Sequence, residues 1–313
     1  MNKKNNINRK NISDEEVNEL SKIINIIENK WLAHANLLTP SKFNIYHYYP
    51  YLFKQFFVGV DSDKMRKFTI SARLFSDSIF LLDCVIDSES KNISHGFGED
   101  ILRYQAMQFE SYHILYQLFT IDSFFWNRFQ VYLLEYTTAV LEEKKIIENQ
   151  LFLSTDVEKL SRKVILGKTG ISRTVIAGLV ELSGQENLYL PLVASMQHFY
   201  IARQICDDIT DWKNDLSKSI YSTVLARLSN KYPDVFIQEI DSEFLNALTR
   251  EFYYGGHAET LLEQAIAELH HATLAIEGLP QSGWHNAIVN LQNECVSIKN
   301  DITKIILKNL QRS

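Results

Sequence analysis

The chain has 313 residues, with 46% apolar and 22% charged side chains and only 11 Gly and 5 Pro. This composition excludes disordered and collagen-like proteins and leaves enough apolar surface for a sizeable core. The net charge of −6 argues against nucleic acid as the main partner, because a phosphate backbone is bound by a surplus of Lys and Arg.

The first residues are polar and contain no apolar run of the kind found in signal peptides. No stretch of about 18 apolar residues occurs, so no membrane span is expected. The three cysteines, Cys84, Cys206 and Cys295, are widely spaced, which suits a reducing compartment and gives no zinc signature. The sequence therefore predicts a soluble, cytoplasmic protein.

From residue 13 to the end, apolar residues recur mostly at spacings of three and four, and alternation with a period of two is almost absent. The sequence therefore predicts an all-α protein, with a flexible polar tail over 1–12 and one helical domain over 13–313. The predicted helices are 14–36, 41–59, 62–89, 98–120, 122–148, 155–183, 189–217, 219–230, 240–250, 257–277 and 282–311.

Two groups of aspartates stand within apolar helical segments. In the first, Asp83 and Asp87 are four residues apart, so both carboxylates leave the same side of a helix. In the second, Asp207, Asp211 and Asp215 follow the same spacing and form an acidic row. Asp208 lies about 100° round the helix from that row.

Carboxylates that crowd together in apolar surroundings repel one another and lose hydration, so a cation is expected among them. A ligand set made only of oxygen, with no His or Cys, favours Mg²⁺, which commonly binds one or two carboxylates together with substrate phosphates. The alternative is an ordinary solvated acidic surface, which is the usual origin of a single acidic pair. Finding both motifs in apolar helices favours the metal site.

The order of these motifs resembles the class I isoprenoid synthases, and most closely their trans-polyprenyl diphosphate synthase branch. The Asp-rich stretch from Asp83 to Asp87 is similar to the family's first motif, with Cys84 in place of its second aspartate. The stretch from Gly167 to Gly170 matches a Lys-Thr-Gly motif, and Gln204 precedes a second Asp-Asp-x-x-Asp motif at Asp207.

The resemblance implies an all-α bundle with a central active-site cavity, a prenyl diphosphate substrate and a possible homodimer. It implies three Mg²⁺ ions bound together with the diphosphate. The implied catalytic residues are Asp83, Asp87, Asp207 and Asp211, the metal ligands are these four with Asp208 and Asp215, and the diphosphate-binding residues are Lys168, Gln204, Lys218 and Lys213. Aromatic side chains would line the cavity and stabilise a carbocation; the candidates are Phe75, Phe80, Tyr104, Phe109, Phe199 and Tyr200.

The chain also departs from the family's pattern. Chain-elongating members carry a Gly-Gly-Lys-x-x-Arg-Pro element that holds isopentenyl diphosphate, and the stretch GVDSDKMRKFTI offers only Lys64, Arg66 and Lys67 at that place. We therefore first interpret the sequence as a terpene synthase, a lyase that ionises one prenyl diphosphate and cyclises or rearranges the cation. A prenyltransferase, acting on isopentenyl diphosphate or another acceptor, is the alternative. A non-catalytic partner subunit of such an enzyme is the second alternative.

Overall fold

The structure is a computed structural model that describes residues 22, 48–88, 97–148, 157–218, 220–236 and 240–310. Over these ranges it contains ten α-helices and no strand, which confirms the all-α prediction. In the same ranges no helix is long and apolar enough to cross a membrane. The predicted tail over 1–12 and the predicted helix over 14–36 lie outside the described residues, apart from Lys22.

The chain divides into two compact units. The first contains the described parts of Met1–Asn127 together with Val175–Leu188 and Pro280–Asn286, and the second contains Arg128–Thr174, Tyr189–Leu279 and Ala287–Ser313. The prediction of one domain over 13–313 stays a prediction.

In the first unit, the helix α3 (Ser62–Ser88) packs along α4 (Phe97–Leu118). Ser71 and Ser111 fix this contact, since each buried hydroxyl donates to the other residue's carbonyl oxygen over 3.0 Å. The short helix α7 (Thr174–Ser183) packs against α3 at Gly178. A Cβ at Gly178 would lie 2.3 Å from the ring of Phe68, so only a glycine admits this aromatic side chain.

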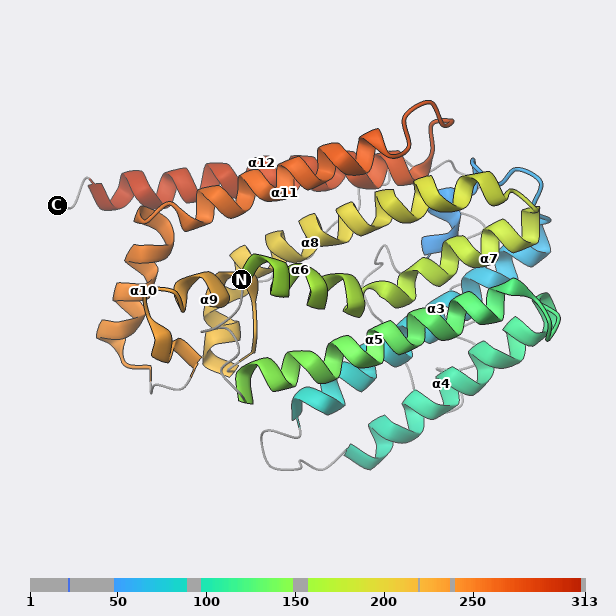
Figure 1. The fold of residues 1–313 in the computed structure, drawn as a ribbon, viewed down its shortest axis with the longest axis horizontal. Coiled ribbons are helices and arrows are strands. Elements are labelled where there is room, and N and C mark those ends of the chain that lie inside the picture. The colour runs from blue at the N-terminus through green and yellow to red at the C-terminus, as the bar shows by residue number, and fades with distance from the viewer. Residues whose placement is uncertain are drawn as a thin grey trace. The chain divides into compact units, whose positions relative to one another are not determined.

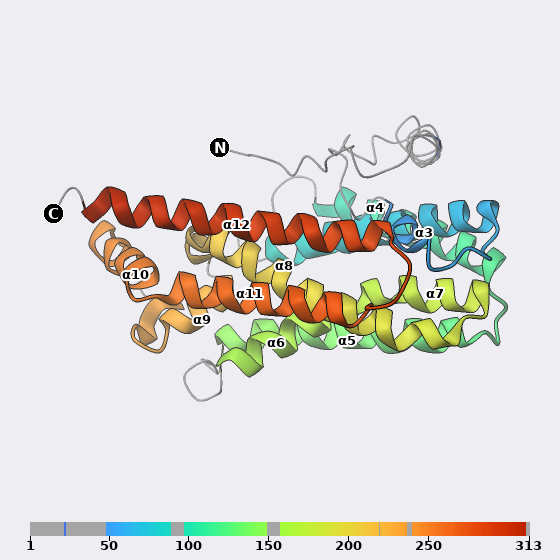
Figure 2. The same ribbon diagram turned by 90° about the horizontal axis from the view of Figure 1, so that it is seen from above.

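The second unit is built around α8 (Tyr189–Lys218), which packs against α6 (Val157–Lys168), α9 (Thr223–Leu228) and α11 (His257–Leu274). Figure 1 shows α8 running between α11 and α6. The unit also holds α10 (Ser242–Tyr254) and most of α5 (Phe124–Glu148) and α12 (Gly283–Leu310). In Figure 2 α12 runs back along α11.

The core of this unit explains why α8 is so long. Its apolar face is buried from Leu192 to Leu216, and Trp212 packs its indole against Phe252 of α10 with ring centroids 5.3 Å apart. On another side of α8, the buried thiols of Cys206 and Cys295 lie 3.3 Å apart between α8 and α12. Burial of this continuous apolar face stabilises α8 as one helix. The acidic row lies on the same helix.

Two predicted helices differ from the observed ones. The predicted helix 41–59 is wrong over its described part, which holds a short 3₁₀ turn, η4 (Tyr49–Phe53), with Pro50 at its start and buried aromatic side chains around it. The predicted helix 155–183 is interrupted by a second 3₁₀ turn, η6 (Gly170–Arg173), between α6 and α7. The other predicted helices that fall within the described ranges agree with the observed bounds to within about four residues.

Candidate active site

The acidic row of the second motif lies on the C-terminal half of α8. Asp211 is exposed, Asp207 and Asp215 are partly buried, and Asp208 is only 3% exposed. Between these carboxylates the side chains of Ile209 and Trp212 turn into the core. The helix therefore presents the row along one edge, because its opposite face is fixed by apolar packing.

Asp208 differs from its neighbours in that both of its carboxylate oxygens accept hydrogen bonds. Its Oδ1 accepts from Gln204 Nε2 over 2.7 Å, and its Oδ2 accepts from the backbone N–H of Thr223 over 2.7 Å. Burial raises the pKa of Asp208, and these two hydrogen bonds oppose the shift. Thr223 is the first residue of α9, so the carboxylate ties the start of α9 to the middle of α8.

Burial and repulsion from neighbouring carboxylates raise the pKa values of Asp207 and Asp215. Burial raises the pKa of Asp207 to about 6, and the charges of Glu294, Asp208 and Asp211 add to the shift, although Arg203 opposes it at 3.1 Å. Burial raises the pKa of Asp215 to about 7, and the charges of Asp208 and Asp211 add to this shift as well. The row therefore carries an electrostatic strain that a bound cation would relieve.

This strain predicts an unusual dependence of stability on pH. Because the folded pKa values of about 6 and about 7 exceed the unfolded value of ~3.9, the folded chain binds protons more tightly than the unfolded one. The stability from Asp207 and Asp215 is present below about pH 4 and is lost as the pH rises through 6 and 7. We expect the Tm of the metal-free protein to fall by ~2–4 °C between about pH 5 and about pH 8. That fall corresponds to ~1 kcal/mol once solvent screening of the half-exposed Asp207 is allowed for.

The measurement is differential scanning calorimetry of the wild type and of Asp215→Asn, each with EDTA and with Mg²⁺. The variant should show a flatter dependence on pH, and Mg²⁺ should restore stability to the wild type at high pH. A metal-free wild type whose Tm falls no more steeply with pH than that of Asp215→Asn would contradict the strain.

Lys168, the last residue of α6, lies between Gly167 of α6 and Gly170 of η6, and a Cβ at either glycine would meet another atom at under 3 Å. A Cβ at Gly167 would stand 2.4 Å from Cβ of Ala139 on α5, so this glycine lets the two helices touch. A Cβ at Gly170 would stand 2.7 Å from Nη2 of Arg173. The Lys-Thr-Gly stretch therefore has a steric reason for its glycines that is separate from any role of the lysine.

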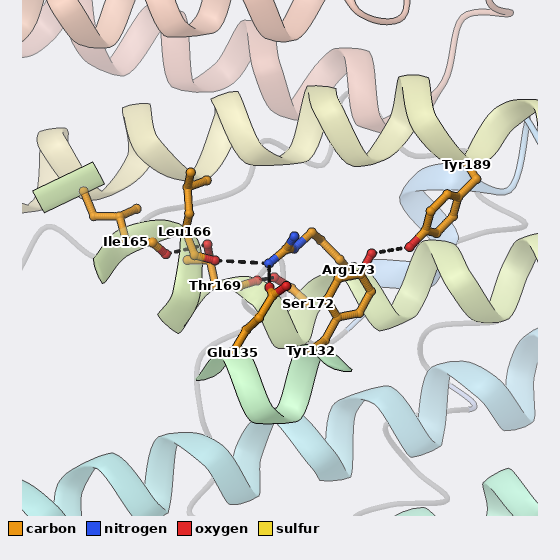
Figure 3. A network of polar contacts seen from close by, with 8 residues as sticks. All are labelled: Tyr132, Glu135, Ile165, Leu166, Thr169, Ser172, Arg173 and Tyr189. Carbon is orange, nitrogen blue, oxygen red and sulfur yellow. Dashed lines mark hydrogen bonds and ion pairs between the residues drawn. The ribbon is translucent and has the colours of Figure 1, made fainter. Parts of the chain in front are cut away.

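Arg173 organises the turn that follows Lys168, as Figure 3 shows. Its buried guanidinium pairs with Glu135 of α5, donates to the carbonyl oxygen of Leu166 over 3.3 Å, and lies 4.4 Å from the ring centroid of Tyr132. Thr169 completes the turn, since its hydroxyl donates to the carbonyl oxygen of Ile165 over 2.7 Å. These contacts satisfy carbonyls at the end of α6 and explain why one predicted helix is divided here.

The remaining predicted diphosphate ligands occupy different environments. Lys213 and Lys218 are exposed on α8, and Lys213 Nζ lies 5.3 Å from the ring centroid of Trp212. Gln204 donates its side-chain amide hydrogen bond to Asp208. Lys168 Nζ lies 2.8 Å from Glu143 Oε2 of α5, a contact that no sequence motif indicated.

The first acidic motif belongs to the first unit. Asp83 and Asp87 both lie on α3, and Asp83 is partly exposed. The side chains of Cys84 and Asp87 lie outside the described part of the chain. That Asp83 and Asp87 share a metal cluster with the row on α8 stays a prediction.

The predicted aromatic lining is partly revised. Phe109 is 72% exposed and Phe80 is 45% exposed, so we withdraw both as candidates for a closed cavity. Phe75, Phe199 and Tyr200 are buried, and Phe199 meets Tyr200 edge-on with centroids 5.7 Å apart.

Among the described side chains, no group of three or more His, Cys, Asp or Glu is arranged to hold a metal ion by itself. Carboxylates spaced along one helix each offer a single ligand rather than a closed cage. Mg²⁺ usually keeps several waters and takes the rest of its ligands from one or two carboxylates and a substrate phosphate. That the acidic row binds Mg²⁺ together with a substrate phosphate stays a prediction.

No protein-family model matches the sequence, and no curated protein matches it. Solved structures do match. A geranylgeranyl pyrophosphate synthase from Corynebacterium glutamicum has a TM-score of 0.70 at 17% identity, covering 93% of this chain and 96% of that one. The chain has the class I isoprenoid synthase fold.

Two further isoprenoid synthases agree with this result. A polyprenyl synthase from Caulobacter crescentus, complexed with calcium and isoprenyl diphosphate, has a TM-score of 0.69 at 14% identity and covers 93% of this chain and 99% of its own. An octaprenyl pyrophosphate synthase from Helicobacter pylori has a TM-score of 0.67 at 14% identity. It covers 88% of this chain and 96% of its own. The fold expected from the resemblance is thereby confirmed.

Proposed function

We propose that the chain is a Mg²⁺-dependent prenyltransferase that ionises an allylic prenyl diphosphate and passes the prenyl group to an acceptor. The observation that carries this proposal is the strained row of Asp207, Asp211 and Asp215 on an isoprenoid synthase fold. The similar solved structures are prenyl diphosphate synthases, and they favour the prenyltransferase alternative over the terpene synthase that the sequence placed first.

In this proposal Asp207, Asp211 and Asp215 hold Mg²⁺ on α8. The part of Asp83 and Asp87 as further metal ligands stays a prediction from the sequence. The metal would neutralise the negative charge that develops on the diphosphate as the carbon–oxygen bond breaks. Asp208 keeps α9 in place rather than supplying a free ligand. Lys168 offers its ammonium to the diphosphate, and buried aromatic side chains such as Phe199 exclude water from the cation.

The nature of the acceptor depends on the stretch in which elongating enzymes bind isopentenyl diphosphate. Here Lys67 Nζ pairs with Asp63 Oδ2 at 2.9 Å on the first turn of α3, and Arg66 lies 3.6 Å from the same carboxylate. The stretch has no match to the Gly-Gly-Lys-x-x-Arg-Pro element of elongating enzymes, which favours an acceptor other than isopentenyl diphosphate, or cyclisation with no acceptor. Chain elongation remains the first candidate because of the neighbours, and terpene synthesis is the second because of this stretch.

The test is incubation of the purified protein with Mg²⁺ and allylic diphosphates of increasing length, with and without isopentenyl diphosphate. A longer prenyl diphosphate supports elongation, and a hydrocarbon or prenyl alcohol formed without isopentenyl diphosphate supports the terpene synthase. Release of no pyrophosphate from any substrate would overturn both and favour the non-catalytic partner subunit.

Two further expectations are kept as proposals. Leu102, Phe109 and Tyr116 are exposed at intervals of seven on α4, an apolar row that supports the predicted homodimer. The cytoplasmic location, drawn from the sequence, stays a prediction.

A further inference from the structure

The ammonium of Lys168 already has an anionic partner. Its Nζ lies 2.8 Å from Oε2 of Glu143, and the side chains of the lysine and the glutamate are 35% and 19% exposed. A carboxylate oxygen at this distance makes the same charge-assisted hydrogen bond that a diphosphate oxygen would make. A diphosphate that binds Lys168 must therefore take the ammonium from Glu143 or share it.

The carboxylate of Glu143 also acts on the second acidic motif. Its charge adds to the upward shift of the pKa of buried Asp208. Burial raises the pKa of Tyr221 to about 12, a hydrogen bond with Ser161 opposes the shift, and the charges of Asp208 and Glu143 add to it. Glu143 therefore lies within electrostatic reach of the same region in which the proposed function places a diphosphate.

We propose that Glu143 is the resident counter-ion of Lys168 and selects for diphosphate by competing for its ammonium. This inference rests on the proposed function and names a residue that no motif contains. A ligand with one negative charge gains little by displacing a carboxylate from Lys168. A metal-bound diphosphate brings several negative charges together with its own cations, so it can displace Glu143 and tolerate the nearby carboxylate.

The neighbouring ion pair provides a matched control. Glu142 precedes Glu143 on α5, and its Oε1 lies 2.7 Å from Nζ of Lys163 on α6. The two pairs thus join the same two helices with the same chemistry. They differ in that Lys163 is 63% exposed and has no part in the proposed site.

The experiment is isothermal titration of magnesium pyrophosphate into the wild type, Glu143→Gln and Glu142→Gln. Glu143→Gln frees the Lys168 ammonium from its carboxylate partner, so it should bind magnesium pyrophosphate about threefold to tenfold more tightly at low ionic strength, and salt should reduce the gain. Glu142→Gln should bind as the wild type does. Glu143→Ala removes the same charge and has the same expected result, should the Gln variant not fold.

A second background separates competition from a general effect of charge. In Lys168→Met, adding Glu143→Gln should leave the affinity for magnesium pyrophosphate nearly unchanged, because the group for which Glu143 competes is gone. Equal tightening in that background would overturn the competition. Unchanged or weaker binding by Glu143→Gln alone would overturn it too. A wild type that binds no magnesium pyrophosphate would instead count against the proposed function.

Discussion

Asp207→Asn should lower kcat by at least about 100-fold while leaving the helical content unchanged. Asn keeps the size of the side chain and an oxygen that can accept from Arg203, but it removes the negative charge proposed to hold Mg²⁺. Loss of one group that stabilises developing charge typically costs ~10²–10³ in rate. The measurement is steady-state turnover on an allylic diphosphate, with circular dichroism to monitor the fold.

Stability gives an independent readout of the same substitution. Because burial and neighbouring carboxylates raise the pKa of Asp207 to about 6, neutralising it should stabilise the metal-free protein at neutral pH. The same variant should gain less from added Mg²⁺ than the wild type does. Asp301→Asn is the control, since Asp301 pairs with Lys304 on the exposed surface of α12. Unchanged turnover in Asp207→Asn would remove this residue from the metal site.

Gly167→Ala should destabilise the fold by ~1–3 kcal/mol and weaken diphosphate binding as well. The new methyl group would stand 2.4 Å from Cβ of Ala139 and 3.3 Å from the carbonyl oxygen of Glu135, so α6 must move away from α5. That movement would carry Lys168, the next residue, away from its present position. The measurements are chemical denaturation and titration with magnesium pyrophosphate.

Two variants show whether crowding is the cause. Gly98→Ala, in the first turn of α4, adds a methyl group where nothing lies within 4 Å, and should be neutral or slightly stabilising. Ala139→Gly on α5 removes the obstructing methyl and should partly restore a Gly167→Ala protein, despite the lower helix propensity of glycine. A Gly167→Ala protein as stable as the wild type would show that α5 and α6 adjust without cost.

Much of the helical fold could be predicted from the sequence, because apolar residues spaced three and four apart indicate long amphipathic helices. The predicted 189–217 differs from α8 by a single residue at its end. The division at η6 could not be foreseen, since it depends on Arg173 reaching back to the carbonyl of Leu166 and to Glu135 of another helix. Such contacts between distant parts of the chain leave no local pattern.

The acidic row was visible in the sequence for the same reason, since its members are four residues apart on one helix. The hydrogen-bond and ion-pair partners of these aspartates could not be predicted from the sequence. The spacing places Asp208 about 100° round the helix from Asp207 but does not give its partners. The carboxylate of Asp208 receives two hydrogen bonds, and that of Asp207 faces Arg203. Likewise Glu143 is one of two adjacent glutamates, and only the packing of α5 on α6 shows which of them meets Lys168.

The carboxylate bridge from Asp208 to the backbone of Thr223 has a consequence for mutagenesis. Loss of activity alone would not distinguish Asp208 from its neighbours, although we expect its substitution to act by loosening the contact between α8 and α9. Its signature would be faster amide exchange over the first turn of α9 with metal affinity retained, which is the reverse of the signature expected of a true ligand.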